Sequence, residues 1–471
     1  MRSSHAYSVR PLPICVSILL MMCWLTPAIA HAADEHPATA STGTTKLPVF
    51  PGARGFGTDT RAGRGGRVIA VTSLANDGPG SLRAALNEAG PRIIVFKVGG
   101  VITLRDKLYV REPFITVAGQ TAPGGGITLR DFGLVIVTND VLIQHLRVRP
   151  GNQGDIDASA NDAIEVLGNR ENEDVTGGYN VVLDHISASW AEDEVLSTWF
   201  GAHDVTVSWS VISEGLNHSR HDKGDHSSGM VIGGHSERIS VHHTLFAHNH
   251  SRNPLYKWGG THEFTDNVVY GWGALSTDIL EGQPIARINI LRNTYLPGPA
   301  TYLTQEMLIE PSDDEGAPQL YVEGNLGPNI SDPRNAPWDG MFFKFSMQRA
   351  PRHYRAARAF ATPLAVSSER ADAAAVLRAA GASLPQRDAI DARVVADVEQ
   401  QRGKIIDSPA QVGGYAKIAN GEAALDGDED GMPDTWESSV SLNPQDSSDG
   451  KQDRNGDGYT NVEEYLHSLQ P

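Results

Sequence analysis

Val141-Leu-Ile-Gln-His-Leu146 and Val181-Val-Leu-Asp-His-Ile186 are two of seven short apolar segments, called hexads below, that decide the fold of this chain. The other five are Val205-Thr-Val-Ser-Trp-Ser210, Ile239-Ser-Val-His-His-Thr244, His262-Glu-Phe-Thr-Asp-Asn267, Ile288-Asn-Ile-Leu-Arg-Asn293 and Leu320-Tyr-Val-Glu-Gly-Asn325. The steps between their starts vary in length, but none is shorter than the low twenties. Stacked coils of a minimum length, with loops of unequal length between them, give this spacing. The hexads therefore predict an all-β chain folded as a right-handed parallel β-helix.

The last residues of three successive hexads support the same architecture. Asn267, Asn293 and Asn325 occupy equivalent positions, where stacked amides would satisfy the backbone groups of successive turns. The alternative all-β architecture is an antiparallel sandwich. Turn dipeptides typical of hairpins are scarce between the hexads, which favours the β-helix.

The N-terminal residues are typical of a secreted protein. Arg2 and Arg10 precede an apolar stretch over 14–25, and Ala30-His-Ala32 provides small residues for cleavage. Residues 1–32 are predicted to be a signal peptide, since about twelve apolar residues are too few for the alternative, a membrane anchor. Residues 33–46 form a polar leader without apolar periodicity.

The remaining composition excludes several partners. Both cysteines, Cys15 and Cys23, lie in the signal peptide, so no disulfide is expected in the mature chain. Of the 39 lysines and arginines two lie in the same segment, which leaves 37 against 57 acidic residues, a net charge of about −20. We expect no binding to nucleic acid or anionic membranes, no membrane span, and a monomer.

The chain divides into three parts after the leader. Residues 47–350 contain the hexads and are predicted to form the β-helix domain, with Ser81 as the N-cap of a short helix. Residues 351–420 are rich in alanine and carry helical spacing over 373–378 and 391–401. This helical extension is expected to pack along the outside of the β-helix or to cap its end.

Residues 421–471 contain two copies of a calcium-binding pattern. Twelve-residue loops begin at Asp426 and Asp453, each with oxygen-bearing side chains at positions 1, 3, 5, 9 and 12 and glycine at position 6. Ca²⁺ takes six to eight oxygen ligands, and the glycine permits the sharp turn. Both loops resemble EF-hand and dockerin-type loops; the alternative is a solvated acidic tail. The predicted ligands, with a structural role, are Asp426, Asp428, Asp430, Asp434, Glu437, Asp453, Asn455, Asp457, Asn461 and Glu464.

Residues 180–257 carry the candidate chemistry, with carboxylates early and cations late. Four motifs follow one another: Asp184-His185 at a strand end, a turn that begins at Asp193, His242-His243, and Arg252-Asn-Pro-Leu-Tyr-Lys257. In combination these motifs resemble the pectate lyases, the parallel β-helix polysaccharide lyases of the family 1 type. The resemblance covers about residues 47–345.

The resemblance implies a role for individual residues. Asp162 and Asp193 match the family's calcium ligands, but the second aspartate of the turn is Ser197 here, and Glu194 is the expected substitute. Arg252 matches the catalytic arginine, the base. Lys257 replaces the family's second arginine and, with Lys223, would bind substrate carboxylates; His221 and His226 are candidate groove acids. Asp184 is expected to support the site and not to bind metal. The nine histidines between 218 and 262 also raise a zinc site as an alternative, although no zinc spacing is present.

The implied function is that of a secreted, calcium-dependent pectate lyase that cleaves α-1,4-polygalacturonate, a pectic polysaccharide, by β-elimination. Two alternatives remain at this stage. A β-helix glycoside hydrolase of the polygalacturonase type needs two or three carboxylates around a water, and no such group accompanies the hexads. A non-catalytic polysaccharide-binding β-helix is compatible with the calcium tail and with Ser197.

Overall fold

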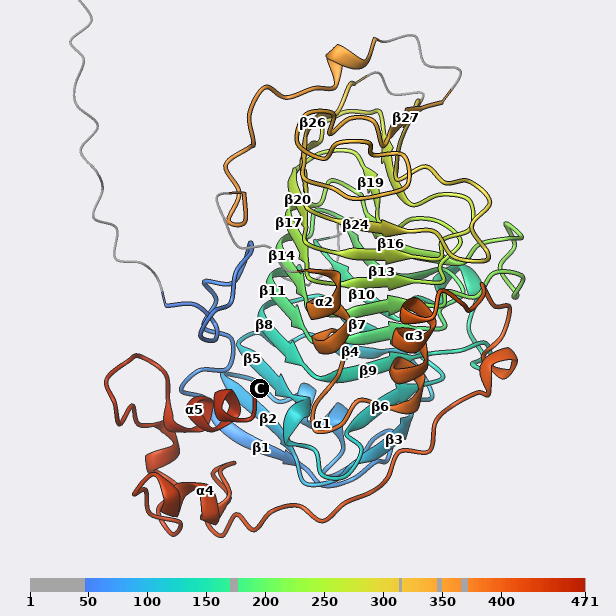
Figure 1. The fold of residues 1–471 in the computed structure, drawn as a ribbon. Helices are drawn as coiled ribbons and strands as arrows, with labels where there is room; N and C mark the ends of the chain where they lie inside the picture. The colour runs from blue at the N-terminus through green and yellow to red at the C-terminus, as the bar shows by residue number, and fades with distance from the viewer. Residues whose placement is uncertain (1–46, 170–176, 313–315, 345–349, 366–371, 471) are drawn as a thin grey trace, which may run out of the picture. The chain divides into compact units, whose positions relative to one another are not determined.

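The computed structural model describes residues 47–169, 177–312, 316–344, 350–365 and 372–470, all within one unit, Lys46–Pro471. The predicted signal peptide and leader lie outside the described residues. Three sheets, in which every strand pairing is parallel, account for the described strands (Figure 1). From β2 to β25 each coil of the chain contributes one strand to each sheet in turn, so the β-helix prediction is confirmed.

The strands divide among the sheets as follows. The ten-stranded sheet contains β1 (Arg67–Val71), β2 (Arg92–Phe96), β5 (Ile115–Ala118), β8 (Asn139–Gln144), β11 (Tyr179–Asp184), β14 (His203–Ser208), β17 (Glu237–His242), β20 (Thr261–Thr265), β23 (Arg287–Leu291) and β26 (Gln319–Glu323). The nine-stranded sheet contains β4 (Leu108–Val110), β7 (Leu134–Ile136), β10 (Ile164–Leu167), β13 (Glu194–Trp199), β16 (Ser228–Ile232), β19 (Leu255–Lys257), β22 (Thr277–Leu280), β25 (Met307–Glu310) and β27 (Met341–Phe343). The eight-stranded sheet contains β3 (Gly100–Thr103), β6 (Ile127–Arg130), β9 (Leu146–Arg149), β12 (Ser187–Ser189), β15 (Val211–Ser213), β18 (Leu245–Ala247), β21 (Val268–Tyr270) and β24 (Thr294–Leu296).

The seven hexads stack directly on one another in the ten-stranded sheet. The first residue of each pairs with the first residue of the next, from Val141 and Val181 through to Ile288 and Leu320. The first and third residues of the hexads point into the common core, where Val181 and Leu183 are fully buried. Alternation along each strand thus places one apolar row inside every coil.

The fifth residue of every hexad turns the chain toward the next sheet. All seven have left-handed backbone conformations, from φ 47° at Trp209 to φ 71° at Gly324. Four of these side chains stack outside the turn: His145 on His185 (4.8 Å between ring centroids), His185 on Trp209 (6.1 Å) and Trp209 on His243 (4.3 Å). The strained turn positions therefore support one another across coils.

The predicted asparagine ladder is present. Asn267 Nδ2 donates to Asn293 Oδ1 at 2.9 Å, and Asn293 Nδ2 donates to Asn325 Oδ1 at 3.0 Å. Each amide also donates to a backbone carbonyl of the preceding coil, as Asn293 does to Phe264 O at 2.8 Å. The ladder satisfies turn backbone groups that the interior would otherwise leave unpaired.

The helices lie outside the three sheets. Ser81 accepts from Ala84 N–H as the N-cap of α1 (Leu82–Leu86), as predicted. In the extension, α2 (Ala373–Ala379) and α3 (Ala389–Glu399) pack apolar residues against β15, β18 and β21 (Figure 1). Short 3₁₀ turns, η1 to η5, occupy Gly119–Thr121, Ala158–Ala160, Pro351–His353, Pro409–Val412 and Asp449–Lys451. Among the described residues, no helix combines the length and apolar character that crossing a bilayer requires.

The C-terminal segment, residues 421–470, returns to the first strands of the β-helix. It contains α4 (Asp434–Ser439) and α5 (Asn461–Ser468), which lie beside β1 and β2 in Figure 1. Met432, Val462 and Leu466 are buried against Ile93 and Val95, the outward-facing residues of β2. This segment therefore covers the outer face of the first coils.

Candidate active site

A groove of about 910 Å³ runs across the outer face of the nine-stranded sheet, over β4, β7, β10, β13, β16 and β19. Its floor is one row of paired outward residues: Val135, Glu165, Ser197, Val231 and Leu255. With strands about 4.8 Å apart, six strands span roughly 24 Å. The groove is therefore long enough for several units of a polymer.

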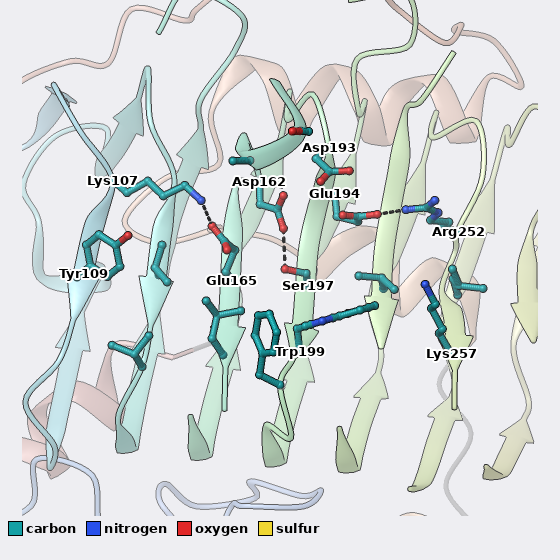
Figure 2. Close-up of a pocket in the computed structure, with 18 of the residues that line it drawn as sticks. Lys107, Tyr109, Asp162, Glu165, Asp193, Glu194, Ser197, Trp199, Arg252 and Lys257 are labelled. Atoms are coloured by element: carbon teal, nitrogen blue, oxygen red, sulfur yellow. Dashed lines mark hydrogen bonds and ion pairs between the residues drawn. The ribbon is translucent and has the colours of Figure 1, made fainter. Parts of the chain in front are cut away.

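Three predicted calcium ligands meet at the centre of this groove (Figure 2). Asp162 precedes β10, Asp193 lies directly before β13, and Glu194 begins β13, so a strand follows Asp193 where a turn was expected. One oxygen of each carboxylate lies within 4.8 Å of the others. Burial, and then the charges of Glu165 and Asp193, raise the pKa of Asp162 well above its ordinary value. Closely spaced, largely buried carboxylate oxygens are the ligands that a hard cation such as Ca²⁺ prefers.

A fourth carboxylate, missed by the sequence reasoning, lies beside Ser197. Ser197 Oγ donates to Asp162 Oδ2 at 2.6 Å, and Glu165 pairs with Ser197 on the neighbouring strand. Lys107 Nζ forms an ion pair with Glu165 (Figure 2). The alternation of side chains along β10 places Glu165 on the groove face. Its position beside Ser197 depends on how β10 pairs with β13, and the spacing of the hexads does not reveal that pairing.

The predicted base and its companion lysine lie at one side of the carboxylates. Arg252 forms an ion pair with Glu194, and burial lowers the pKa of Arg252 although the charge of Asp193 opposes the shift. Lys257 Nζ lies 5.2 Å from the Trp199 ring centroid and 4.9 Å from that of Trp258. Burial, then the charges of Arg252 and Lys223, lower the pKa of Lys257. These cations make that side of the groove complementary to carboxylate groups.

The two predicted groove histidines stand behind Asp193. His226 Nε2 lies 2.6 Å from Asp193 Oδ1, and the His221 and His226 rings stack at 4.0 Å. Neither lines the groove, whereas Lys223 does. Asp193, His221 and His226 also offer ligand atoms within 4.8 Å of one another. These three residues are therefore where a zinc ion, the alternative raised from the sequence, would bind.

Asp184 lies on the ten-stranded sheet, away from the groove residues. Its carboxylate accepts from Gln144 Nε2 at 3.0 Å and Ser208 Oγ at 2.7 Å, and it contacts His185 Nδ1 at 2.9 Å. These donors outweigh burial and hold its pKa well below the usual range. A carboxylate so fully occupied by donors fits the supporting role expected of it.

Curated proteins are similar to this chain along nearly its whole length. A protein of Neosartorya fischeri described as probable pectate lyase C is 34% identical over 447 residues, covering 92% of this chain and 96% of its own. The chain belongs to the pectate lyase family. Its members are polysaccharide lyases, so this chain is an enzyme of that class.

A second curated relative agrees with this membership. Probable pectate lyase C of Aspergillus flavus is 32% identical over 437 residues, covering 91% of this chain and 95% of its own. Solved structures that match include a pectate lyase of Bacillus sp. N165 in complex with trigalacturonate (16% identity, TM-score 0.45, 70% of this chain and 98% of that one). A Bacillus subtilis pectate lyase matches at 14% identity and TM-score 0.46, over 73% of this chain and 99% of that one. No family model matches the chain.

In this lyase the first C-terminal loop gathers most of its predicted ligands. Asp426, Asp428 and Asp430 offer oxygens within 4.8 Å of one another, and Glu437 joins Asp430 in a second such group. Asp434 belongs to neither group, and its Oδ1 accepts from Gly427 N–H at 2.7 Å. Position 9 of such loops often acts through water, so this placement fits the pattern.

The second loop is more exposed and more fully hydrogen-bonded. Asp453, Asp457 and Glu464 form one group of candidate ligands. Asn455 Nδ2 donates to Asp457 at 3.1 Å, Asn461 Nδ2 donates to Asp449 O at 2.8 Å, and Arg454 pairs with Glu464 at 2.9 Å. A cation at this loop would have to compete with Arg454.

Proposed function

We propose that this pectate lyase cleaves α-1,4-polygalacturonate by calcium-dependent β-elimination with Arg252 as the base. The proposal also includes secretion, supported by the signal-like composition of residues 1–32. The observation that carries it is the convergence of Asp162, Asp193 and Glu194 beside Arg252 in one groove.

The reaction requires loss of the C5 proton of a uronic acid unit and departure of the oxygen at C4. Arg252 is the basic side chain paired with one of these three carboxylates, and its partial burial disfavours its charged form. Ca²⁺ held by Asp162, Asp193 and Glu194 would bind the substrate carboxylate and stabilise the negative charge that develops at C5. Glu194 belongs to both the carboxylate group and the ion pair with Arg252. With a cation bound, Glu194 would no longer be free to pair with Arg252, and the neutral form of Arg252 that can accept the proton would be easier to reach.

The rest of the groove would hold the polymer. Lys257 and Lys223 lie where they can pair with carboxylates of neighbouring sugar units, and Trp199 offers an apolar ring face beside Lys257. Lys107 is already paired with Glu165 and serves to hold that carboxylate in place. An acidic protein can thus bind a polyanion, because a cation and local basic groups supply the missing positive charge.

Absorbance of the C4–C5 double bond in the product tests the proposal. We expect polygalacturonate to give this absorbance with Ca²⁺, none after chelation, and recovery when Ca²⁺ is returned. New reducing ends without the absorbance would indicate a hydrolase, and polymer binding without product a non-catalytic protein. Either result would overturn the lyase mechanism.

A pair of variants separates the groove cation from those of the C-terminal loops. Asp193→Asn should raise the Ca²⁺ concentration for half-maximal activity at least about tenfold, because it removes a charged ligand. Asp453→Asn, in the second C-terminal loop, should leave that concentration unchanged. Equal effects of the two substitutions would mean that calcium acts on stability and not in the groove.

A further inference from the structure

Asp449 lies outside both twelve-residue loops, yet its carboxylate faces the first of them. Its oxygen forms a group with those of Asp430 and Glu437, all within 4.8 Å of one another. All three side chains are buried: Asp430 is 5% exposed, Glu437 0% and Asp449 7%. No basic side chain forms an ion pair with any of the three among the residues that the structure describes.

The hydrogen bonds of Asp449 follow the pattern of the loop's own aspartates. In Asp426 and Asp430, one oxygen accepts from a loop N–H (Gly431 N at 3.2 Å and Met432 N at 2.9 Å), and the other has no partner among the described residues. Asp449 Oδ2 likewise accepts from Asn443 N–H at 3.0 Å, and its Oδ1 is left without a partner in the same described part of the chain. Each carboxylate is thus oriented by the backbone and keeps one oxygen available to a ligand.

Glu437 provides the strongest indication of a ligand. It is fully buried, and neither carboxylate oxygen has a hydrogen-bond partner among the described residues. Leaving a buried carboxylate unpaired is costly, so such groups are paired or coordinate a metal.

The backbone next to Asp449 approaches one of the same carboxylates closely. A methyl group at Gly450 would overlap Oδ2 of Asp430, the oxygen that no described residue hydrogen-bonds. A cavity of about 300 Å³ joins Asp428, Asp430 and Gly450 to Arg67 and Val68 of β1. Asp449 and Glu437 do not line this cavity, so it is Asp430 that places the proposed site next to the first strand of the β-helix.

We propose that Asp449 binds a Ca²⁺ ion together with Asp430 and Glu437, and that this ion fastens the segment around Asp449 to α4 and closes the C-terminal segment over β1. Carboxylate oxygens without nitrogen or sulfur ligands select a hard cation, and a flexible set of three acidic residues suits Ca²⁺ better than the strictly octahedral Mg²⁺. The backbone carbonyl of Asp449 accepts from Asn461 of the second loop at 2.8 Å. Binding at Asp449 therefore also orders the neighbouring loop. The groove chemistry plays no part in this proposal.

Hydrogen exchange of the full-length protein during a CaCl₂ titration from the chelated state tests the site locally. We expect Ca²⁺ to slow exchange in residues 67–71 and 443–452, and Asp449→Asn to raise the half-saturating Ca²⁺ concentration for these peptides about tenfold or more. Asp449→Ala, which removes the oxygen entirely, should raise it further. Asp446→Asn is the matched control, because Asp446 lies in the same segment, is exposed and bonds only to Ser448 among side-chain contacts of the described residues.

Gly450→Ala provides a second variant that leaves the charge unchanged. It should weaken Ca²⁺ binding by displacing Asp430, while Mg²⁺ at the same concentrations should not replace Ca²⁺ in the wild type. If both Asp449 variants gave the same titration curve as the wild type, the proposal would be overturned, and any bound ion would be held by the twelve-residue loop alone. Protection of residues 67–71 that is independent of Ca²⁺ would remove the fastening role.

Discussion

Arg252 and Lys257 belong to one short motif but lie in different surroundings, and these predict different kinetic effects. Arg252 is partly buried beside Glu194, whereas Lys257 lies against the rings of Trp199 and Trp258. Arg252→Lys should lower kcat by about 10²–10⁴-fold with little change in KM, because a general base acts in the transition state. Steady-state kinetics on polygalacturonate measure both constants. An Arg252→Lys enzyme with normal turnover would exclude Arg252 as the base.

Lys257→Ala is the companion variant. It should raise KM more than it lowers kcat, and the effect should shrink as salt is added, because its assigned role is to pair with a substrate carboxylate. A loss of kcat that is independent of salt would instead place Lys257 in the chemical step.

At this scale, residues within local motifs are predictable from sequence and residues defined by stacking are not. Asp162, Asp193 and Arg252 stand out through their places in motifs, and the structure brings the two aspartates together with Arg252 nearby. Glu165 and Asp449 carry no comparable local signal. Glu165 reaches the groove through its pairing with Ser197 of the next coil, and Asp449 approaches the first loop only through the fold of the C-terminal segment.

The elements show why the hexad spacing is informative. Each step from one hexad to the next corresponds to one strand pairing in the ten-stranded sheet, because the first residues of successive hexads pair with one another. The sequence does not reveal that the fifth residue of each hexad is left-handed, because only Gly324, and to a lesser degree Asp266, is a residue type that favours this conformation, and the other five are His, Trp or Arg. Support from stacked neighbours makes that conformation tolerable.

The asparagine ladder predicts a large stability cost for its central member. Asn293→Ala would take away the partners that Asn293 provides to Phe264 O and to Asn267 N–H in the interior. Asn267 Nδ2 and Asn325 Oδ1 would each keep one partner, Val241 O and Asn293 N–H. At roughly 1–3 kcal/mol for each of the two buried groups that lose their partner, we expect a loss of at least about 2 kcal/mol in the free energy of unfolding. Denaturant unfolding measures it, with Asn335→Ala on an exposed loop as the control. Equal stability of the two variants would show that the ladder contributes little.

Buried histidines in and beside these turns predict how stability depends on pH. Burial lowers the pKa of His262 and His242 to about 4 and of His145 and His243 to about 3. Between about pH 6.5 and 4 the unfolded chain therefore binds protons that the folded chain does not, and this contribution to stability is lost as pH falls. The contribution is fully present only above the unfolded pKa.

His262→Gln isolates one such group. His262 Nε2 donates to Gly259 O at 2.8 Å, a bond that glutamine can replace without a titratable ring. The melting temperature of this variant should fall less steeply from pH 7 to pH 5 than that of the wild type, whereas His235→Gln, outside the buried turns, should keep the wild-type slope. A steeper slope for His262→Gln would contradict the assignment of a buried neutral ring.

For the whole molecule, the calcium loops are recognisable as local patterns but their docking site is not. Nothing in the spacing of Asp426 to Glu437 indicates that Met432, between them, packs on Ile93 of β2, near the other end of the described chain. For the helical extension, the sequence left two positions possible, along the outside of the β-helix or at its end. The structure places α2 and α3 along the eight-stranded sheet. There Arg149, fully buried in β9, forms ion pairs with Asp388 (2.5 Å) and Asp391 (2.6 Å) at the start of α3.

Removal of residues 421–471 should therefore lower stability while sparing catalysis. The truncation exposes Ile93 and Val95 and removes the buried side chains of Met432, Val462 and Leu466. At about 1.5–3 kcal/mol for each buried apolar side chain, the loss is of the order of 5 kcal/mol or more, before any contribution from bound Ca²⁺. The groove lining ends at Lys257, so lyase activity at low temperature should be retained. Thermal unfolding and initial rates of the truncated and intact proteins, with Met432→Ala as an intermediate variant, measure both effects. A truncated protein that is folded but inactive would place the tail in the active site, and an unchanged melting temperature would mean that its docking on β2 stabilises nothing.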